Sequence, residues 1–309
     1  MRIIFMGTPQ PAANCLQALI DAQEQIVCVV TQPDRPKGRH LHLAASPVKE
    51  LAHKYKLPIE TPEKAKDLIF IDRIKALAPD LIVVVAYGKI LPKELLAIPK
   101  NGAINLHASL LPKYRGAAPV QWAILKGEAE TGVTVMQINE NLDTGDILLQ
   151  EKVLIDPEDT AETLLDKLFT IGASQLLRAI EQIKKGAITK IPQKEAEATY
   201  APSITKESGE IDWKRSATEI NNRVRALIPW PAAHTFYKGK MLKLLKARPV
   251  PAPGKFKPGE IISTQAALII ACGIGGLEII EVQPEAGRKM AAEEFLRGHP
   301  LKIGEVLPD

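Results

Sequence analysis

The chain has 309 residues, of which 46% are hydrophobic and 25% are charged. This composition is typical of a globular protein of about two domains, and it excludes an intrinsically disordered or collagen-like chain. The net charge of +4 is small, but the whole excess of Lys and Arg follows Gly186. Residues 223–257 contain nine Lys or Arg and no Asp or Glu, which indicates either a polyanion-binding surface or an ordinary basic surface.

Three cysteines, Cys15, Cys28 and Cys272, lie far apart and form no CxxC pair, so neither a disulfide framework nor a structural zinc site is expected. The N-terminal apolar run is too short for a signal peptide, and no uncharged stretch approaches the roughly 20 residues of a membrane span. The sequence therefore predicts a soluble protein of the reducing cytoplasm without a membrane partner, and we expect a monomer.

The first half of the chain alternates predicted strands and helices. Apolar runs typical of strands buried on both faces occupy residues 2–6, 26–30, 81–86, 102–106 and 132–138. An amphipathic helix is predicted at 12–22, and Ser-Pro and Thr-Pro pairs, which supply an N-cap and a first-turn Pro, predict helices at 47–55 and 62–77. This alternation predicts an open, mostly parallel, Rossmann-like α/β sheet.

The second half begins with a long helix. Asp159 and Glu162 have the spacing of a capping box, and helical periodicity continues to Gly186, so the first domain is expected to span residues 1–186. Residues 187–206 have no sustained periodicity and are expected to be a linker. In the second domain, residues 207–309, a small β-barrel or sandwich is predicted from one helix at 216–227 and short strands near 233–237, 240–246, 259–263, 267–272 and 276–282.

A cluster of polar residues in the first domain follows a predicted strand. Asn105 and His107 are two residues apart, so they share one face of the strand, and ligands of open parallel sheets gather beyond the carboxyl ends of strands. Asp143, in the turn after the strand at 132–138, is the best candidate to orient the imidazole. An amide, an imidazole and a carboxylate can carry out acyl transfer without a protein nucleophile. Alternatively, the three residues serve only as cap, loop histidine and turn residue.

Other familiar sites are missing from the sequence. Only Gly7 follows the first strand, so the glycine pattern of dinucleotide-binding proteins is not met, and no Walker loop, zinc-protease or serine-hydrolase motif occurs. His40 and His42 lack acidic or Cys partners and are expected to be solvent-exposed rather than metal ligands. The loop from Gln32 to Ala45 is polar and lacks apolar periodicity, so we expect a mobile loop that takes part in recognition.

Two motifs carry a resemblance to a known superfamily. The stretch Asn105-Leu-His107-Ala-Ser109-Leu-Leu-Pro112 resembles the signature of enzymes that transfer the formyl group of 10-formyltetrahydrofolate. Residues 132–145, which end in Leu142-Asp143-Thr-Gly145, resemble the second signature of these enzymes, at the same separation. Within the superfamily the chain resembles the methionyl-tRNA formyltransferase family along nearly its whole length.

The resemblance implies a Rossmann-like formyltransferase domain followed by an OB-like β-barrel that helps to hold initiator methionyl-tRNA. It implies that Asn105 and His107 contact the oxyanion, that Asp143 orients His107 and relays a proton through water, and that no metal is needed. The residues implied to bind the folate donor are Val85, Ala86, Tyr87, Gly88, Ser109, Leu110, Leu111, Pro112, Leu142 and Gly145. Those expected to bind tRNA are Arg35, Lys37, Arg39, Arg223, Arg225, Lys243, Lys246 and Arg248.

Three alternatives are open at this point. A sugar-nucleotide formyltransferase shares the first signature and also has a second small domain, but it does not account for the basic residues at 35–39 and 223–257. Glycinamide ribonucleotide formyltransferase has the same fold and would not need the second domain. A non-catalytic nucleic-acid-binding protein would explain the basic stretch and leave Asn105, His107 and Asp143 unexplained.

Overall fold

The structure is a computed structural model that describes residues 1–37 and 42–308, without the side chains of residues 36, 37 and 42. The chain forms two compact units. The first consists of Met1–Pro119, Glu130–Leu154 and Leu165–Ala201, and the second of Val120–Ala129, Ile155–Leu164 and Pro202–Asp309. In the described part of the chain, no helix combines the length and the apolar character that a membrane span requires.

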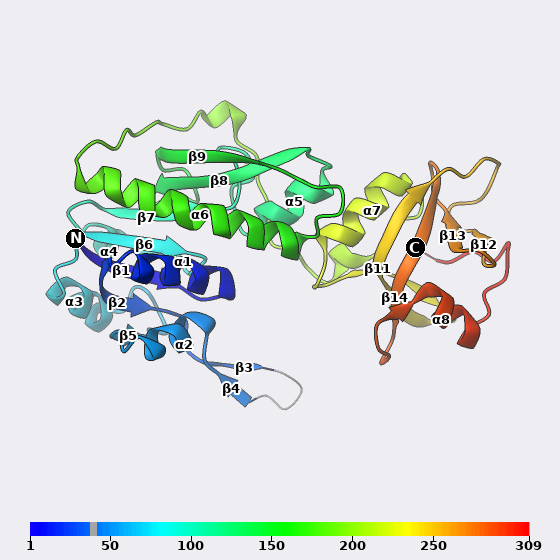
Figure 1. The fold of residues 1–309 in the computed structure, drawn as a ribbon, viewed down its shortest axis with the longest axis horizontal. Helices are drawn as coiled ribbons and strands as arrows, with labels where there is room; N and C mark the ends of the chain where they lie inside the picture. The colour runs from blue at the N-terminus through cyan, green and yellow to red at the C-terminus, as the bar shows by residue number, and fades with distance from the viewer. Residues whose placement is uncertain (38–41, 309) are drawn as a thin grey trace. The chain divides into compact units, whose positions relative to one another are not determined.

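A seven-stranded sheet forms the centre of the first unit (Figure 1). Its order is β5 (Ile59–Glu60), β2 (Gln25–Val30), β1 (Arg2–Gly7), β6 (Leu81–Val85), β7 (Ala103–His107), β8 (Glu130–Gln137) and β9 (Ile147–Leu154). The strands from β5 to β7 pair in parallel, whereas β8 and β9 add an antiparallel edge. The predicted mostly parallel α/β sheet is thus confirmed.

Helices cover both faces of this sheet, which is why its central parallel strands are mostly apolar. On one face lie α1 (Gln10–Asp21) and α6 (Ala161–Lys184), joined where the Cys15 thiol donates to the Phe169 carbonyl at 3.8 Å. On the other face, side chains of α3 (Leu68–Ala76) and α4 (Lys93–Leu96) form one apolar cluster with alternate residues of β1, β2 and β6. The first unit also contains α2 (Pro47–Lys54).

Two predicted helix starts are wrong. The helix expected from residue 62 begins at Leu68, because the Asp67 carboxylate accepts the free N–H groups of Ile69 and Phe70 at 2.9 and 3.3 Å. The helix expected to be capped by Asp159 begins at Ala161 and is capped by Thr160, whose hydroxyl accepts the Thr163 N–H at 3.2 Å. In both cases a capping side chain further along the chain marks the start of the helix.

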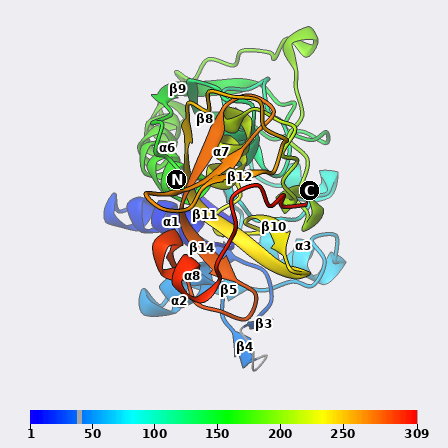
Figure 2. The same ribbon diagram turned by 90° about the vertical axis from the view of Figure 1, so that its right-hand side faces the viewer.

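The second unit contains an antiparallel sheet of six strands (Figures 1 and 2). Its order is β10 (Ala233–Tyr237), β11 (Lys240–Val250), β14 (Gly276–Pro284), β13 (Leu268–Ala271) and β12 (Ile261–Ser263), and β15 (Met290–Ala291) pairs with β14. The core includes the fully buried Trp213 and side chains of α7 (Ala217–Ala226) and α8 (Ala292–Gly298). This all-antiparallel domain agrees with the predicted OB-like fold. The unit also contains α5 (Pro119–Leu125), which was not predicted.

Two segments expected to be irregular contain ordered pairing. Within the loop from Gln32 to Ala45, β3 (Arg35–Lys37) and β4 (His42–Ala44) form an antiparallel ribbon. In the expected linker, residues 187–201 belong to the first unit and residues 202–206 to the second. The expected linker includes one short 3-10 turn, Glu195–Glu197. A second 3-10 turn, Glu207–Gly209, follows the linker directly.

Candidate active site

The end of β7 presents Asn105 and His107 on one face of the sheet, as their spacing predicted. Leu106 points the opposite way, toward α6, where a side chain at Gly172 would come within 2.6 Å of it. Asn105 is half-buried, and its side chain makes no hydrogen bond to the described residues. Its amide is therefore available to a ligand beyond the strand end.

The imidazole of His107 is held between a carbonyl and a carboxylate. Its Nε2 lies 2.9 Å from the Tyr114 carbonyl oxygen, which can only accept, so Nε2 carries a hydrogen and donates it. Its Nδ1 lies 3.7 Å from Oδ2 of Asp143, beyond hydrogen-bond distance but within that of an ion pair. No direct hydrogen bond joins Asp143 to His107 at this distance, and Nδ1 is the ring nitrogen left for the reaction.

Asp143 lies in a tightly constrained loop. Its φ of +51° is in the left-handed region, and its Oδ2 accepts the Gly116 N–H at 2.8 Å. A side chain at Gly145 would lie 1.7 Å from the Gln137 carbonyl oxygen, so only glycine fits there. This glycine is required by the backbone path of the loop, which brings the carboxylate to His107.

The residues expected to contact folate after β6 alternate between buried and exposed. Val85 and Tyr87 are buried, and burial raises the pKa of the Tyr87 hydroxyl to about 12. Ala86 and Gly88 are exposed and have φ values of +47° and +80°. Gln32 donates to the Tyr87 carbonyl at 2.9 Å, which ties this turn to the base of the β3–β4 ribbon.

The second expected folate segment, Ser109 to Pro112, is shaped from inside by β8. The Thr134 hydroxyl donates to the Ser109 carbonyl at 2.6 Å and accepts the Leu111 N–H at 3.2 Å. Ser109 itself is buried, and its hydroxyl donates to the Lys113 carbonyl at 2.6 Å, so it shapes the loop from within. Leu142, on the neighbouring loop, is 59% exposed.

Two polar residues near the site, the buried Arg115 and the half-buried Gln193, were missed by sequence reasoning. Arg115 is 1% exposed, and its guanidinium donates to the side-chain oxygen of Gln193 at 3.0 and 3.1 Å. Gln193 in turn donates to the carbonyls of Asp143 and Gly145, each at 2.8 Å. Arg115 follows the first signature by three residues and could have been chosen for that reason, whereas Gln193 lies in a segment without any periodic pattern.

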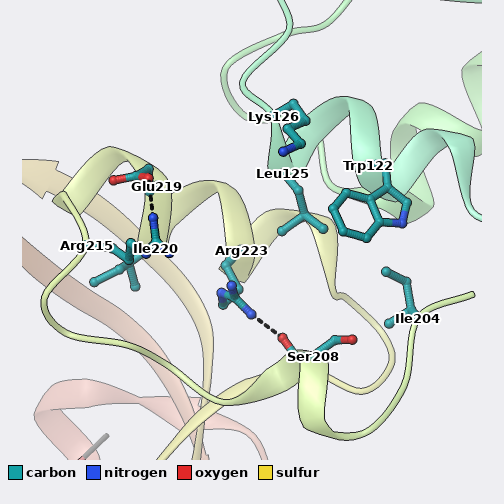
Figure 3. A pocket seen from close by; sticks show the side chains of 9 residues that line it. All are labelled: Trp122, Leu125, Lys126, Ile204, Ser208, Arg215, Glu219, Ile220 and Arg223. Carbon is teal, nitrogen blue, oxygen red and sulfur yellow. Dashed lines mark hydrogen bonds and ion pairs between the residues drawn. The ribbon is translucent and has the colours of Figure 1, made fainter. Parts of the chain in front are cut away.

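A pocket of about 350 Å³ lies within the second unit (Figure 3). Apolar and cationic side chains share its wall, and Figure 3 shows Arg223 between Trp122 on one side and Arg215 on the other. Arg223 donates to the Ser208 carbonyl, and burial together with the nearby Arg215 lowers its pKa. The remaining lining residues are Leu125, Lys126, Ile204, Glu219 and Ile220.

The other cations expected to bind tRNA differ in how far they are neutralised. Arg225 donates to the Asp159 carbonyl at 2.8 Å, and Arg248 forms two hydrogen bonds with Glu278 at 2.7 and 3.0 Å. Lys246 lies 3.5 Å from Glu158. Lys243, half-buried on β11, forms no ion pair with the described residues.

Three residues expected to bind tRNA, Arg35, Lys37 and Arg39, belong to the segment that contains β3 and β4. Arg35 is exposed at the start of β3. The side chain of Lys37 lies outside the described residues, as do Arg39 and His40. The expected roles of Lys37 and Arg39 in tRNA binding therefore stay predictions.

Comparison with protein families matches both parts of the chain. The family model of formyl transferases matches residues 1–180, and the model of the formyl transferase C-terminal domain matches residues 203–300. A protein named methionyl-tRNA formyltransferase from Caldanaerobacter subterraneus subsp. tengcongensis is 48% identical, over 99% of this chain and 100% of the relative. Another of the same name from Thermodesulfovibrio yellowstonii is 50% identical, over 98% of this chain and 97% of the relative.

Solved structures share the fold at low identity. An N-formyltransferase from Helicobacter canadensis, in complex with folinic acid and dTDP-3-aminofucose, aligns with a TM-score of 0.68 at 20% identity, over 93% of this chain and 99% of that one. HypX from Aquifex aeolicus, in complex with tetrahydrofolic acid, aligns with a TM-score of 0.66 at 20% identity, over 100% of this chain and 51% of that one.

Proposed function

The chain belongs to the formyl transferase family, and we infer that it transfers the formyl group of 10-formyltetrahydrofolate to the α-amino group of methionyl-tRNA, giving N-formylmethionyl-tRNA for translation initiation. The observation that carries this inference is similarity along the whole chain, because relatives named methionyl-tRNA formyltransferase are 48% and 50% identical with both domains included. The sugar-modifying neighbour is only 20% identical, so that alternative has less support. The enzyme would work in the cytoplasm, which agrees with three buried, free cysteines.

The formyl donor is proposed to lie where β6 and β7 end. Ala86 and Gly88 follow a fully buried strand and are exposed, so backbone donors and acceptors there are within reach of a flat heterocycle. Leu110 and the exposed Leu142 would add apolar contact. A folate needs this combination, because its pterin ring pairs polar edges with two apolar faces.

In the reaction, the methionyl amine attacks the formyl carbon and a tetrahedral oxyanion forms. The bond between that carbon and the folate nitrogen then breaks, the nitrogen takes up a proton from water, and tetrahydrofolate leaves. An α-amino group titrates near pH 8, so a usable fraction is already neutral and the protein has mainly to position the reactants and stabilise charge. The Asn105 amide would donate one N–H to the oxyanion. His107 would donate from Nδ1 when doubly protonated, since Nε2 is engaged by the Tyr114 carbonyl.

Asp143 would serve this step electrostatically. Its carboxylate, 3.7 Å from Nδ1 of His107, stabilises the ring when Nδ1 is protonated. The proton released by the attacking amine would pass to bulk solvent through water near this carboxylate. Because Gly116 already occupies one lone pair of Oδ2, the carboxylate stays fixed while the imidazole changes charge.

The tRNA would bind through cations on both units. In the second unit, the pocket lined by Trp122, Lys126 and Arg223 joins an indole to positive charge, as single-stranded nucleotides require. Lys243 lacks an anionic partner among the described residues, unlike Lys246 and Arg248 on the same strand, and is therefore suited to bind a phosphate. The expected contacts from Arg35, Lys37 and Arg39 would add to these at the β3–β4 ribbon.

One assay tests the proposed function against its alternatives. The protein is incubated with 10-formyltetrahydrofolate and either methionyl-tRNA, an aminosugar nucleotide or no acceptor, and formylated product is measured. We expect product with methionyl-tRNA alone. Formylation of the sugar would identify a sugar-nucleotide formyltransferase, and tRNA binding without product would identify a non-catalytic RNA-binding protein.

A further inference from the structure

The segment of residues 191–201, here called the strap, runs past both loops that form the candidate active site. At its start, Ile191 exchanges two backbone hydrogen bonds with Ile147, at 2.8 and 2.9 Å, just beyond the Asp143 loop. At its end, the Thr199 carbonyl accepts the Arg115 N–H at 2.9 Å, and the Ala201 N–H donates to the Arg115 carbonyl at 2.7 Å. The strap is thereby anchored to both loops.

Gln193 lies between these anchors, and both the nitrogen and the oxygen of its side-chain amide form hydrogen bonds. Its nitrogen donates to the carbonyls of Asp143 and Gly145, and its oxygen accepts two N–H groups from Arg115. A guanidinium can only donate, so the amide oxygen has to face Arg115 and the nitrogen has to face the carbonyls. Arg115, which also pairs with Glu195 at 2.8 Å, therefore fixes the orientation of the Gln193 side chain.

The contact matters because Asp143 has a left-handed backbone. For a non-glycine residue this conformation is less favourable than the right-handed one, and it persists where its surroundings determine it. Gln193 holds the carbonyl of Asp143, and the Gly116 N–H holds its carboxylate. Together these bonds set the 3.7 Å separation between the carboxylate and Nδ1 of His107.

We propose that Gln193 is a positioning residue for formyl transfer: it acts through the Asp143 backbone to hold the carboxylate beside His107, and Arg115 orients it for this task. The proposal rests on the proposed function in that turnover is measured as formyl transfer. Its structural claim concerns only residues of the first unit, and it has a readout that does not require turnover.

Two substitutions separate the two sides of the amide. Gln193→Glu keeps the shape and the acceptor for Arg115 but cannot donate to the carbonyls of Asp143 and Gly145. Gln193→Met keeps the approximate length and loses both contacts. Gln182→Glu is the matched control, because Gln182 on α6 undergoes the same chemical change and its side chain makes no hydrogen bond to the described residues.

We expect kcat to fall on the order of 10-fold to 100-fold in both Gln193 variants, the range associated with misplacing a catalytic group by about 1 Å. The KM values for both substrates should stay within about twofold of normal. Binding of tetrahydrofolate with unchanged stoichiometry would show that the site is folded. The control should retain normal kcat.

The second readout is the imidazole nitrogen resonance of His107, assigned by comparison with a His107→Asn variant. Both Gln193 variants should shift this resonance in the absence of substrate, and the control should not. Normal turnover with an unshifted His107 signal would overturn the proposal. So would normal turnover in Gln193→Glu alone, because then only the contact with Arg115 would matter, or a fall in turnover matched by lost folate sites.

If the wild-type protein fails to formylate methionyl-tRNA, the proposed function falls while the resonance shift still tests the positioning role. If Gln193→Met does not fold, Gln193→Glu decides the question, because its carboxylate retains a partner in Arg115.

Discussion

Replacing Asp143 with Asn tests the electrostatic part of the mechanism with little change in shape. Both residues tolerate the left-handed backbone seen at this position, where φ is +51°. The amide oxygen of Asn can still accept the Gly116 N–H that Oδ2 accepts now. The substitution therefore removes the negative charge beside His107 and leaves the loop in place.

The separation in the structure sets the size of the expected effect. Two unit charges about 4 Å apart interact by about 4 kcal/mol at an effective dielectric constant of about 20, and the pair here is 3.7 Å apart and largely buried. If this stabilisation is felt wholly in the charged transition state, its loss corresponds to about 10³ in rate. We therefore expect kcat to fall on the order of 10³-fold, within the usual range for a positioned acid–base group.

The assay is steady-state formylation of methionyl-tRNA at saturating folate, with the thermal midpoint and tetrahydrofolate affinity measured on the same samples. Asp146→Asn is the control, because Asp146 lies in the same loop and its side chain makes no contact with His107 among the described interactions. A fall of less than about tenfold in Asp143→Asn, with folding intact, would refute the electrostatic role. An equal fall of kcat in Asp146→Asn would show that the effect comes from a change in the loop and not from the loss of the charge of Asp143.

Three further outcomes are expected. Lys243→Glu should raise the KM for methionyl-tRNA and reduce the slope of log K against log salt by about 0.7 to 0.9. Arg248→Glu should change this KM less, because Glu278 already neutralises Arg248. Equal changes of KM in the two variants would contradict this ranking. Arg39→Leu should depress formylation of methionyl-tRNA while sparing a small amine acceptor, and equal loss with both would end its role in tRNA binding. Burial raises the pKa of Cys15, Cys28 and Cys272 to about 12. As the pH rises, the unfolded chain therefore loses these thiol protons before the folded protein does. The free energy of unfolding should fall between about pH 9 and pH 12 for this reason. Thermal midpoints between pH 8 and 11 should show this fall, less steeply in Cys272→Ala, and an unchanged slope in that variant would argue against the burial effect.

Local pattern alone predicted much of the first unit. A strand turns its side chains to alternate faces, so the spacing of Asn105 and His107 placed both on one face, and the apolar runs marked strands covered on both sides. Asp143 could also be chosen from the sequence, because the turn after β8 is recognised from residues that are neighbours in the chain. The start of α3 was predicted wrongly, because the Thr-Pro pair favoured residue 62 whereas the Asp67 carboxylate caps the helix.

The charge of the second unit was decided by the tertiary structure. Along the sequence, residues 223–257 carry nine cations and no acid, yet β11 pairs with β14, whose Glu278 neutralises Arg248 across the sheet. Arg225 is likewise engaged, by the carbonyl of Asp159. A stretch of sequence with only positive charges therefore does not show how positive the protein surface is, because the nearest negative charges come from other strands.

Gln193 is the strongest case of what sequence could not decide. It lies 50 residues beyond Asp143, in a segment without periodicity, and its partners Asp143, Gly145 and Arg115 share no spacing with it. The sequence determined which chemical groups the site contains, because motif and strand period are local properties. Only the tertiary structure decided how they are held, because the hydrogen bonds that hold the Asp143 loop depend on segments brought together by folding.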